Sequence, residues 1–331
     1  MSLLTPEKRQ NRLLLFDGHS LIYRSFFALP GFVTSDGFPT NAIYGYIRTI
    51  LKILKKWPSN SAALALDSKG ETLRKKTFED YKANRPEMPD DLSKQIPVIQ
   101  KITEHMGIKI FKKEGYEADD LIGTLTKLAD EKDIPVFIVS NDKDLMQLVN
   151  KGVKMIVPSN EEDEPSLFNS EKVEEKMGVP PRKVVELLSL QGDKSDNIPG
   201  VPQIGKVRGK KLLDEFGSLQ KIYDNIEKIK SGRIRKTLEE NREQAFLSNR
   251  LVQLYDDIDL EDPLEKTAIS PPDEEKLRKL FGELEFTSLL DELPSNYKDA
   301  DIKIIRTKES LNSLKEDLEK TDTISLDLET T

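Results

Sequence analysis

Residues 13–17 read Leu-Leu-Leu-Phe-Asp, four apolar side chains followed by an acid. A strand without polar alternation is typical of a parallel sheet that helices cover on both faces. Two later segments have the same form: Ala62 to Leu66 leads to Asp67, and Val136 to Val139 leads to Ser140-Asn141-Asp142. These segments predict three buried strands, each with an aspartate at or just beyond its carboxyl end.

Helical patterns separate the predicted strands. They cover residues 42–55, 91–105 and 118–132, and further strands are predicted at 108–111 and 154–157. Strands that alternate with helices indicate an α/β fold with a mostly parallel sheet and flanking helices. Ligands of such open sheets bind beyond the carboxyl ends of the strands, where the aspartates are expected.

The strand signals stop at about residue 170, and a helical region follows. We predict helices at 170–177, 181–190, 207–216, 219–229, 233–254 and, after a proline-containing linker at 262–276, a helical tail at 274–293. Ser218 directly follows Gly217 and is the expected N-cap of one of these helices. Residues 302–331 restart a strand–helix–strand pattern, but thirty residues are too few for a core of their own.

The predicted elements divide the chain into four parts. These are a flexible N-terminus (1–11), an α/β core (12–175), a helical region (176–293) and a linker with the start of another domain (294–331). We expect the chain to be the front part of a longer polypeptide, cut soon after a second domain begins.

The composition excludes several classes of protein. The chain has 331 residues, and no apolar run approaches the ~18–20 residues that span a bilayer. Its polar N-terminus lacks a signal-peptide segment, so we expect a cytoplasmic protein that does not bind membranes. The absence of cysteine excludes disulfides and thiolate metal sites, and the presence of only two histidines disfavours a zinc hydrolase.

Nine acidic residues are candidates for one site at the strand ends. Besides the strand-end aspartates, they lie in the segment 116–120 and in two loops, 141–144 and 192–197. The set is Asp17, Asp67, Glu117, Asp119, Asp120, Asp142, Asp144, Asp193 and Asp196. Each alone has an ordinary explanation as a turn residue, a helix-terminal charge or an Asx-turn. Their occurrence together favours a shared function.

Nine carboxylates in one pocket repel one another, and bound cations relieve that repulsion. Hard divalent ions with oxygen ligands fit this set, so we predict two or three ions of Mg²⁺ or Mn²⁺. Two such ions about 4 Å apart hydrolyse phosphodiesters. The net charge of −8 at first disfavours a nucleic-acid partner, but removing nine ion-binding carboxylates leaves −8 + 9 = +1 for the rest of the chain.

Two basic segments are candidates for contact with nucleic acid. Residues 69–85 contain Lys69, Arg74, Lys75, Lys76, Lys82 and Arg85. Phe78 and Tyr81 lie among these cations, and such a pattern can neutralise phosphates and stack on bases. In the second segment, residues 199–211, a tight turn leads into a helix that begins with several cations, and helix starts bind phosphate. A solvated helix and a plain helix–helix connection are the respective alternatives.

A family resemblance rests on six segments taken in order. They are Leu15-Phe16-Asp17-Gly18-His19, Asp67, Tyr81-Lys82-Ala83-Asn84-Arg85, Gly115-Tyr116-Glu117-Ala118-Asp119-Asp120, Asp142-Lys143-Asp144-Leu145 and Gly192-Asp193-Lys194-Ser195-Asp196-Asn197. With these segments the chain closely resembles the N-terminal 5′ nuclease domain of bacterial DNA polymerase I, in the flap endonuclease superfamily, over about residues 11–293. The resemblance implies a PIN-like fold with a helical arch and a helix-hairpin-helix.

The resemblance also implies roles for individual residues. Asp17, Asp67, Glu117 and Asp119 look like ligands of the metal nearer the attacked phosphate, and Asp120, Asp142, Asp144, Asp193 and Asp196 look like the set around the second metal. Lys82 and Arg85 resemble the catalytic pair of the arch that positions and polarises the scissile phosphate. The expected DNA-binding residues are Tyr81, Gly200, Ile204, Gly205, Lys206, Arg208 and Lys210.

The chain departs from the family pattern in the hairpin. Gln203 stands where the family usually has glycine, and Val207-Arg208-Gly209 replaces the usual Lys-Thr-Ala. A glycine there supplies a backbone conformation that glutamine adopts only with strain. The departures bear on the hairpin geometry and on the K⁺ ion that the resemblance implies, and we hypothesise that Arg208 compensates by contacting phosphate.

The C-terminal segment Ser325-Leu326-Asp327-Leu328-Glu329 resembles the first acidic motif of a 3′→5′ exonuclease domain. Asp327 and Glu329 would be metal ligands there, with partner carboxylates beyond Thr331. We expect this second site to be incomplete and inactive.

The sequence therefore predicts a metal-dependent 5′→3′ exonuclease or flap endonuclease that removes RNA primers and repairs DNA. Its partners would be nicked or 5′-flap DNA and an RNA primer, with a polymerase domain on the same chain and a monomeric state. A non-catalytic DNA-binding module of the same fold is the alternative. A single-strand ribonuclease is disfavoured by the hairpin, since such an enzyme needs no duplex grip.

Overall fold

The computed structural model describes residues 9–158, 164–293, 305 and 307–319. The chain divides into two compact units, Met1–Leu293 and Pro294–Thr331. In the described part of the second unit, the element is helix α14 (Lys308–Leu318). The strands expected around that helix, with Asp327 and Glu329, lie outside the described residues.

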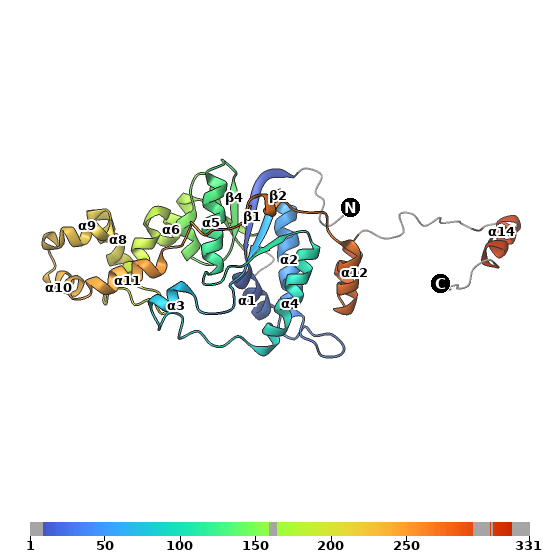
Figure 1. Cartoon of the computed structure of the whole chain (residues 1–331), viewed down its shortest axis with the longest axis horizontal. Helices are drawn as coiled ribbons and strands as arrows, with labels where there is room; N and C mark the ends of the chain where they lie inside the picture. Colours follow the sequence, from blue (N-terminus) through green and yellow to red (C-terminus); the bar gives the residue numbers. More distant parts are fainter. Residues whose placement is uncertain (1–8, 159–163, 294–304, 306, 320–331) are drawn as a thin grey trace. The chain divides into compact units, whose positions relative to one another are not determined.

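A six-stranded sheet forms the centre of the first unit (Figure 1). Its strands are β1 (Gln10–Asp17), β2 (Ser59–Ala65), β3 (Lys109–Phe111), β4 (Val136–Val139), β5 (Val153–Val157) and β6 (Ser166–Phe168). They are ordered β3-β2-β1-β4-β5-β6, and only the β5–β6 pair is antiparallel. The predicted α/β fold with a mostly parallel sheet is confirmed; β6 escaped prediction because three residues show no period.

Strand β1 is buried on both faces, which explains its unbroken apolar run. Leu13 and Leu15 pack with α5 (Ala118–Asp130) and the helical region. The intervening Leu14 and Phe16 point to the opposite face. That face is covered by α1 (Gly18–Ala28), α2 (Asn41–Lys56), α4 (Asp90–His105), α12 (Glu274–Glu283) and α13 (Thr287–Glu292).

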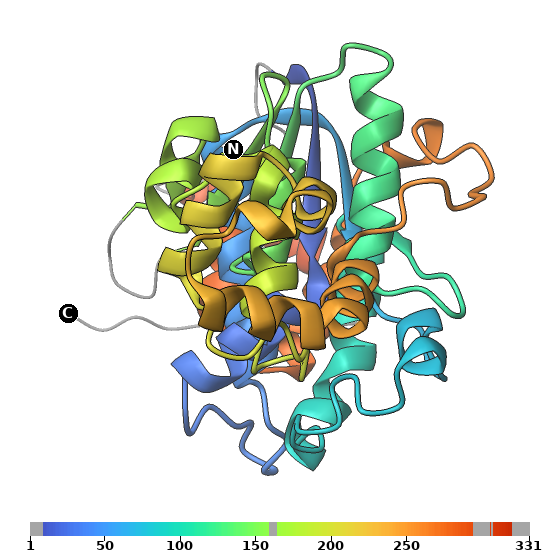
Figure 2. The same cartoon turned by 90° about the vertical axis from the view of Figure 1, so that its left-hand side faces the viewer.

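The helical region faces the viewer in Figure 2. It contains α6 (Ser170–Met177), η2 (Pro181–Lys183), α7 (Val184–Gln191), α8 (Lys206–Phe216), α9 (Leu219–Asp224), η3 (Ile226–Lys228), α10 (Gly232–Glu240) and α11 (Arg242–Val252). Ser218 caps α9 by accepting a hydrogen bond from the N–H of Lys221, as predicted. The single helix predicted at 233–254 is two helices, because the chain turns at Asn241, where φ is −116°.

Two parts of the first unit differ from expectation. Helix α1 was not predicted; it begins directly after β1, where the Asp17 side chain caps it. The predicted helical arch between β2 and α4 is helical only in α3 (Leu73–Thr77), and turns follow it. Pro86 and Pro89 in this stretch disfavour a continuous helix. Among the described residues, no helix combines the length and apolarity needed to cross a membrane.

Candidate metal centre

The carboxyl ends of β1 and β4 place Asp17 in a buried polar position. Phe16 pairs with Val139 across the two strands, so Ser140 lies beside Asp17. The Ser140 hydroxyl donates to Asp17 Oδ2 at 2.5 Å, and the Ser20 N–H donates to Oδ1 at 3.2 Å. Asp17 is 4% exposed, and both of its oxygens are held in place by hydroxyl or backbone donors.

The end of β2 is tied to the start of α5. Asp67 follows β2 and accepts a hydrogen bond from the Ala118 N–H at 2.7 Å. Glu117 is the N-cap of α5, and its own N–H donates to Asp120 Oδ2 at 3.0 Å, which completes a capping box. At this start of α5, burial raises the pKa of Asp119, and the negative charges of Asp142, Asp17 and Asp67 raise it further.

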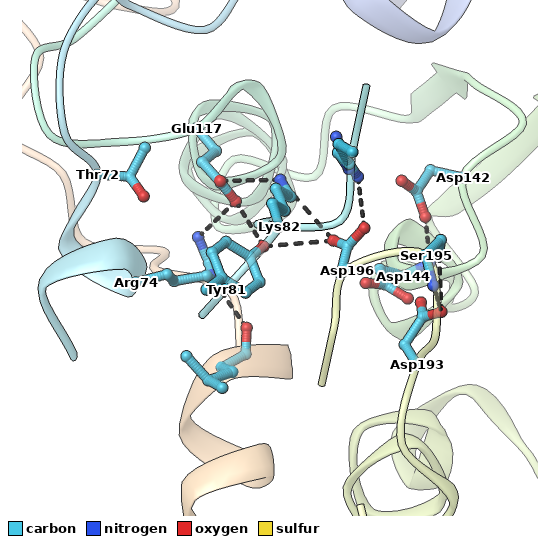
Figure 3. A network of polar contacts seen from close by, with 12 residues as sticks. Thr72, Arg74, Tyr81, Lys82, Glu117, Asp142, Asp144, Asp193, Ser195 and Asp196 are labelled. Carbon is cyan, nitrogen blue, oxygen red and sulfur yellow. Dashed lines mark hydrogen bonds and ion pairs between the residues drawn. The ribbon is translucent and has the colours of Figure 1, made fainter. Parts of the chain in front are cut away.

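Arg74, from α3, lies in the interior and binds the start of α5 (Figure 3). Its guanidinium donates to both oxygens of Asp120 at 2.7 Å and to Glu117 Oε2 at 3.1 Å. It also donates to the carbonyls of Leu251 at 2.7 Å and Gln253 at 2.9 Å, just where α11 ends. Arg74 is 3% exposed, and the Asp120 charge and hydrogen bonds outweigh burial and raise its pKa.

Asp120 and Arg74 were both assigned other roles from the sequence. Asp120 was expected at the second metal, which stays a prediction; in the protein alone Arg74 occupies both of its oxygens, and the N–H groups of Glu117 and Tyr255 donate to them as well. Arg74 was expected among the phosphate-binding cations, but it is buried against carboxylates. An uncompensated buried charge costs several kcal/mol, roughly 3–5 when one partner is removed, so each group requires the other.

A second group of carboxylates surrounds the loop after β4. Asp142 Oδ1 accepts from the N–H of Asp144 at 2.9 Å, where helix η1 (Asp144–Leu148) begins. Asp193 lies in the loop after α7 and pairs with Lys143 at 2.6 Å. Burial raises the pKa of Asp193, but Lys143 and Ser195 hydrogen bonds outweigh it and hold that pKa below its usual value. The buried Asp144 Oδ1 has no hydrogen-bond partner among the described residues.

The nine carboxylates divide by whether a cation lies beside them. Four have a lysine or an arginine beside them: Glu117 with Arg74 and Lys82, Asp120 with Arg74, Asp193 with Lys143, and Asp196 with Lys82 and Arg85. Asp67 lies 3.5 Å from His19 Nδ1, which accepts a hydrogen bond from the Asp67 N–H at 3.3 Å. Four form no ion pair with any described residue, and the pKa of each is raised: Asp17, Asp119, Asp142 and Asp144. Burial is the largest cause in each case, and neighbouring carboxylates add to it; the pKa of Asp17 reaches about 7.

The unpaired carboxylates fit divalent cations. They supply hard oxygen donors, their negative charges raise one another's pKa, and Asp144 Oδ1 is buried without a donor. Within the described ranges, no three Asp, Glu or His side chains converge closely enough to hold an ion by themselves. Mg²⁺ keeps several of its waters in proteins, so its sites do not require three converging side chains.

Lys82, in the segment after α3, lies between the carboxylates of Glu117 and Asp196 (Figure 3). The Lys82 ammonium is 2.8 Å from Glu117 and 3.8 Å from Asp196, and these two charges outweigh burial and raise its pKa. Arg85 donates to Asp196 Oδ1 at 2.5 Å. Lys82 has φ of 57°, a left-handed conformation that costs a non-glycine residue about 1–2 kcal/mol. The fold therefore holds both cations at the carboxylates in spite of backbone strain.

Tyr81 differs from expectation. It was expected to stack on DNA bases, but its ring is 4% exposed and belongs to the core. Its hydroxyl donates to Glu117 at 3.0 Å and lies 3.3 Å from Asp196. Burial, followed by the Glu117 charge, raises the pKa of Tyr81. Tyr81 therefore contacts two of the carboxylates through its hydroxyl, and its buried ring has no face exposed for stacking on a base.

The turn before α8 contains the predicted strain at Gln203, whose φ is 65°. Arg208 donates to the Gln203 carbonyl at 2.6 Å, so it contacts the strained turn itself. Gly200 and Ile204 were expected to bind DNA but are buried, and Ile204 packs in the core. Gly205, Lys206, Arg208 and Lys210 are exposed or partly exposed at the start of α8. In the protein alone Lys206 donates to the Lys176 carbonyl at 2.5 Å, and Lys210 pairs with Asp214 at 2.6 Å.

Several residues that shape the site carry little signal in the sequence. Ser140 was recognised only as part of the loop after β4, and Lys143 only as part of a motif. Arg74 was grouped with exposed cations. In a short helix with consecutive cations, the sequence does not indicate which one is buried. The spacing of Arg74 to Asp120 spans 46 residues, so only the fold brings the pair together.

Comparisons with known proteins match most of this chain. Two family models match the chain: "5'-3' exonuclease, N-terminal resolvase-like domain" over residues 12–178, and "5'-3' exonuclease, C-terminal SAM fold" over residues 179–275. A 5'-3' exonuclease from Aquifex aeolicus is 42% identical over 288 residues, which are 87% of this chain and 97% of that protein. A DNA polymerase I from Caldicellulosiruptor bescii is also 42% identical, over 85% of this chain but 33% of its own length.

Solved structures show the same fold. A T5 5'-exonuclease with bound divalent metal ions (zinc) has a TM-score of 0.62 at 22% identity, covering 83% of this chain and 98% of that one. The catalytic core of Rad2 in complex with DNA substrate has a TM-score of 0.56 at 16% identity, covering 87% of this chain and 93% of that one. The polymerase relative is about three times as long as the region it shares with this chain.

Proposed function

The chain belongs to the 5′-3′ exonuclease family, and from this premise we propose that it hydrolyses phosphodiester bonds near the 5′ ends and flaps of DNA. Water adds to the phosphorus, the bond from phosphorus to the 3′ oxygen breaks, and that oxygen takes up a proton. The downstream strand keeps a 5′-phosphate and the upstream strand a 3′-hydroxyl.

One observation carries this proposal: four buried carboxylates at the strand ends form no ion pair with a described residue, and their pKa values are raised. They are Asp17, Asp119, Asp142 and Asp144. A purely structural cluster would be neutralised from within the chain, as Asp120 is by Arg74. We propose that two or three Mg²⁺ or Mn²⁺ ions supply the missing charge, activate water and stabilise the leaving oxygen when bound.

The cations beside the cluster have a different role in this proposal. Lys82 and Arg85 contact Glu117 and Asp196 in the protein alone and exchange these partners for the phosphate of a bound strand. A guanidinium binds phosphate through paired N–H groups, and an ammonium binds it as a point charge. The start of α8, with Lys206 and Arg208, would hold the duplex through its phosphates.

The biological setting is proposed from the relatives. The polymerase relative contains a region similar to this chain within a protein about three times as long, so a polymerase domain on the same chain, RNA primer removal and DNA repair are proposed for this protein. A monomer acting in the cytoplasm, and a K⁺ ion at the turn before α8, complete the proposal. Gln203, which has left-handed backbone in that turn, is the residue to substitute in a test of K⁺ binding.

The test uses a duplex with a labelled 5′ flap, incubated with and without Mg²⁺. We expect cleavage that requires the metal and that is lost in Asp142→Ala while DNA binding remains. Asp91→Ala, at an exposed surface position, is the matched control and should cut normally. DNA binding without cleavage by the unaltered chain would instead identify a non-catalytic DNA-binding module, and full activity of Asp142→Ala would refute the metal assignment.

A further inference from the structure

Two asparagines join the segment after α3 to the loop after α7. Asn84 donates from its side-chain amide to the carbonyl of Lys194 at 2.5 Å. Asn197 donates from its side-chain amide to the carbonyl of Asp80 at 2.7 Å. Each segment therefore donates one side-chain amide hydrogen bond to the other and accepts one from it. The two segments are far apart in the chain, since the bonded residues are separated by 110 and 117 positions.

The backbone between the two amides is also joined. The Lys82 N–H donates to the Asp196 carbonyl at 2.9 Å, midway between the asparagine contacts. Lys82 itself and Asn197, the residue after Asp196, both have left-handed backbone, with φ of 57° and 54°. Asparagine tolerates that conformation better than most residues. The conformation of both segments is therefore matched to their contact with each other.

The ionic contacts between these segments cannot hold them during the reaction. Lys82 and Arg85 pair with Asp196 in the protein alone. A phosphate would take over both cations, and a bound cation would take over the carboxylate, so these contacts are lost when they are needed. The asparagine amides are neutral and donate to backbone carbonyls, so neither a phosphate nor a metal ion replaces them.

We propose that Asn84 and Asn197 form a neutral clasp that positions Lys82 and Arg85 over the carboxylates while substrate and metal are bound. They are positioning residues, since neither amide is directed to the carboxylate cluster in the contacts described above. The proposal rests on the proposed nuclease function for its consequence in catalysis, but the clasp itself is a property of the protein alone.

The catalytic test uses Asn84→Ala, Asn197→Gly and the double variant on a 5′-flap duplex. Glycine at 197 retains the left-handed backbone and removes only the amide. We expect kcat to fall about tenfold in each single variant, with KM for DNA changed by less than about threefold, because misplaced groups slow the chemical step. The kcat of the double variant should lie within about twofold of the kcat of either single variant, since both substitutions break the same clasp.

Limited proteolysis tests the clasp without nuclease activity. Trypsin cuts after Lys82, whereas Arg85 precedes Pro86 and is a poor site. In metal-free protein, cleavage between Lys82 and Ala83 should be about tenfold faster in Asn84→Ala and Asn197→Gly than in the unaltered chain. Asn60→Ala, at an exposed position at the amino end of β2, is the matched control and should leave the rate unchanged.

The two readouts separate the two proposals. If the unaltered chain does not cut DNA but the variants lose protection from trypsin, the nuclease function fails and the clasp stands. If the unaltered chain cuts DNA and the variants match it in both kcat and protection, the clasp is refuted. A variant with a large KM change and unchanged kcat would also overturn it, because that result assigns the asparagines to DNA binding. Partial recovery of kcat in Asn84→Gln, which keeps the amide donor, would support it.

Discussion

Replacing Asp17 by asparagine should stabilise the metal-free protein at alkaline pH, although it removes a residue of the candidate metal centre. Asp17 is 4% exposed, and folding raises its pKa from 3.8 to about 7. Asparagine keeps an acceptor for the Ser20 N–H and places a donor beside the Ser140 hydroxyl, so the shape of the site is retained. The substitution removes the charge and reverses the direction of the hydrogen bond with Ser140.

The magnitude follows from the pKa difference. A carboxylate whose folded-state pKa is raised contributes stability that is fully present below about pH 4 and is lost as the pH rises through about 7. A difference of about three pH units corresponds to about 4 kcal/mol at pH 8. Asp17→Asn should recover up to that amount, which raises the melting temperature by up to about 8 °C.

The assay is thermal or urea unfolding in EDTA at pH 4 and pH 8, followed by the same series in Mg²⁺. We expect a gain for Asp17→Asn at pH 8, little difference at pH 4, and a larger stabilisation by Mg²⁺ in the unaltered chain than in the variant. Asp91→Asn, at an exposed position, should change stability by less than about 1 kcal/mol at either pH. A variant less stable than the unaltered chain at pH 8 in EDTA, or an equal gain at both pH values, would refute the reasoning.

Three further experiments, with four substitutions between them, test the packing of the first unit. Arg74→Met should lower the free energy of unfolding by about 3–5 kcal/mol, because it leaves Asp120 buried without its cation. Adding Asp120→Leu should restore part of that free energy. If the effects of the two substitutions simply add in urea unfolding, the pairing is contradicted. Gln203→Gly should raise the free energy of unfolding by about 1 kcal/mol by relieving the left-handed strain, and a loss would show that the glutamine side chain is required. Gly200→Ala should lower it by more than about 2 kcal/mol, since a Cβ there would lie 2.3 Å from the Gly192 nitrogen; a melting temperature equal to that of the unaltered chain would rule out this tight contact.

The α/β fold could be predicted because its signal is local. The apolar run at Leu13 to Phe16 and its two counterparts specify buried strands, and an aspartate stands at or within three residues of the end of each strand. The same local reading located the start of α5 at Glu117 and the cap at Ser218. Alternation, capping chemistry and strand order together give the position of the acidic residues at one edge of the sheet.

What could not be predicted is which charges neutralise one another. Asp119 and Asp120 are adjacent in sequence, yet Arg74 takes Asp120 and leaves Asp119 among carboxylates. One step along the start of α5 separates a carboxylate that Arg74 neutralises from one that forms no ion pair with a described residue. Tyr81 shows the same difficulty, because an aromatic ring among cations has the composition of a base-stacking segment but the fold buries it. Partners more than 40 residues away decide these outcomes, as the separations of 46 for Arg74 to Asp120 and 115 for Tyr81 to Asp196 show.

The reach of Arg74 to the carbonyls of Leu251 and Gln253 has a consequence for protein synthesis. Residues that flank the acidic pocket are joined to a helix end 177 residues later in the chain. A ribosome that has released the whole sheet has not yet released that helix end, so Arg74 and Asp120 are still without their final partners. The growing chain therefore acquires its completed pocket late, after nearly all of the first unit has emerged.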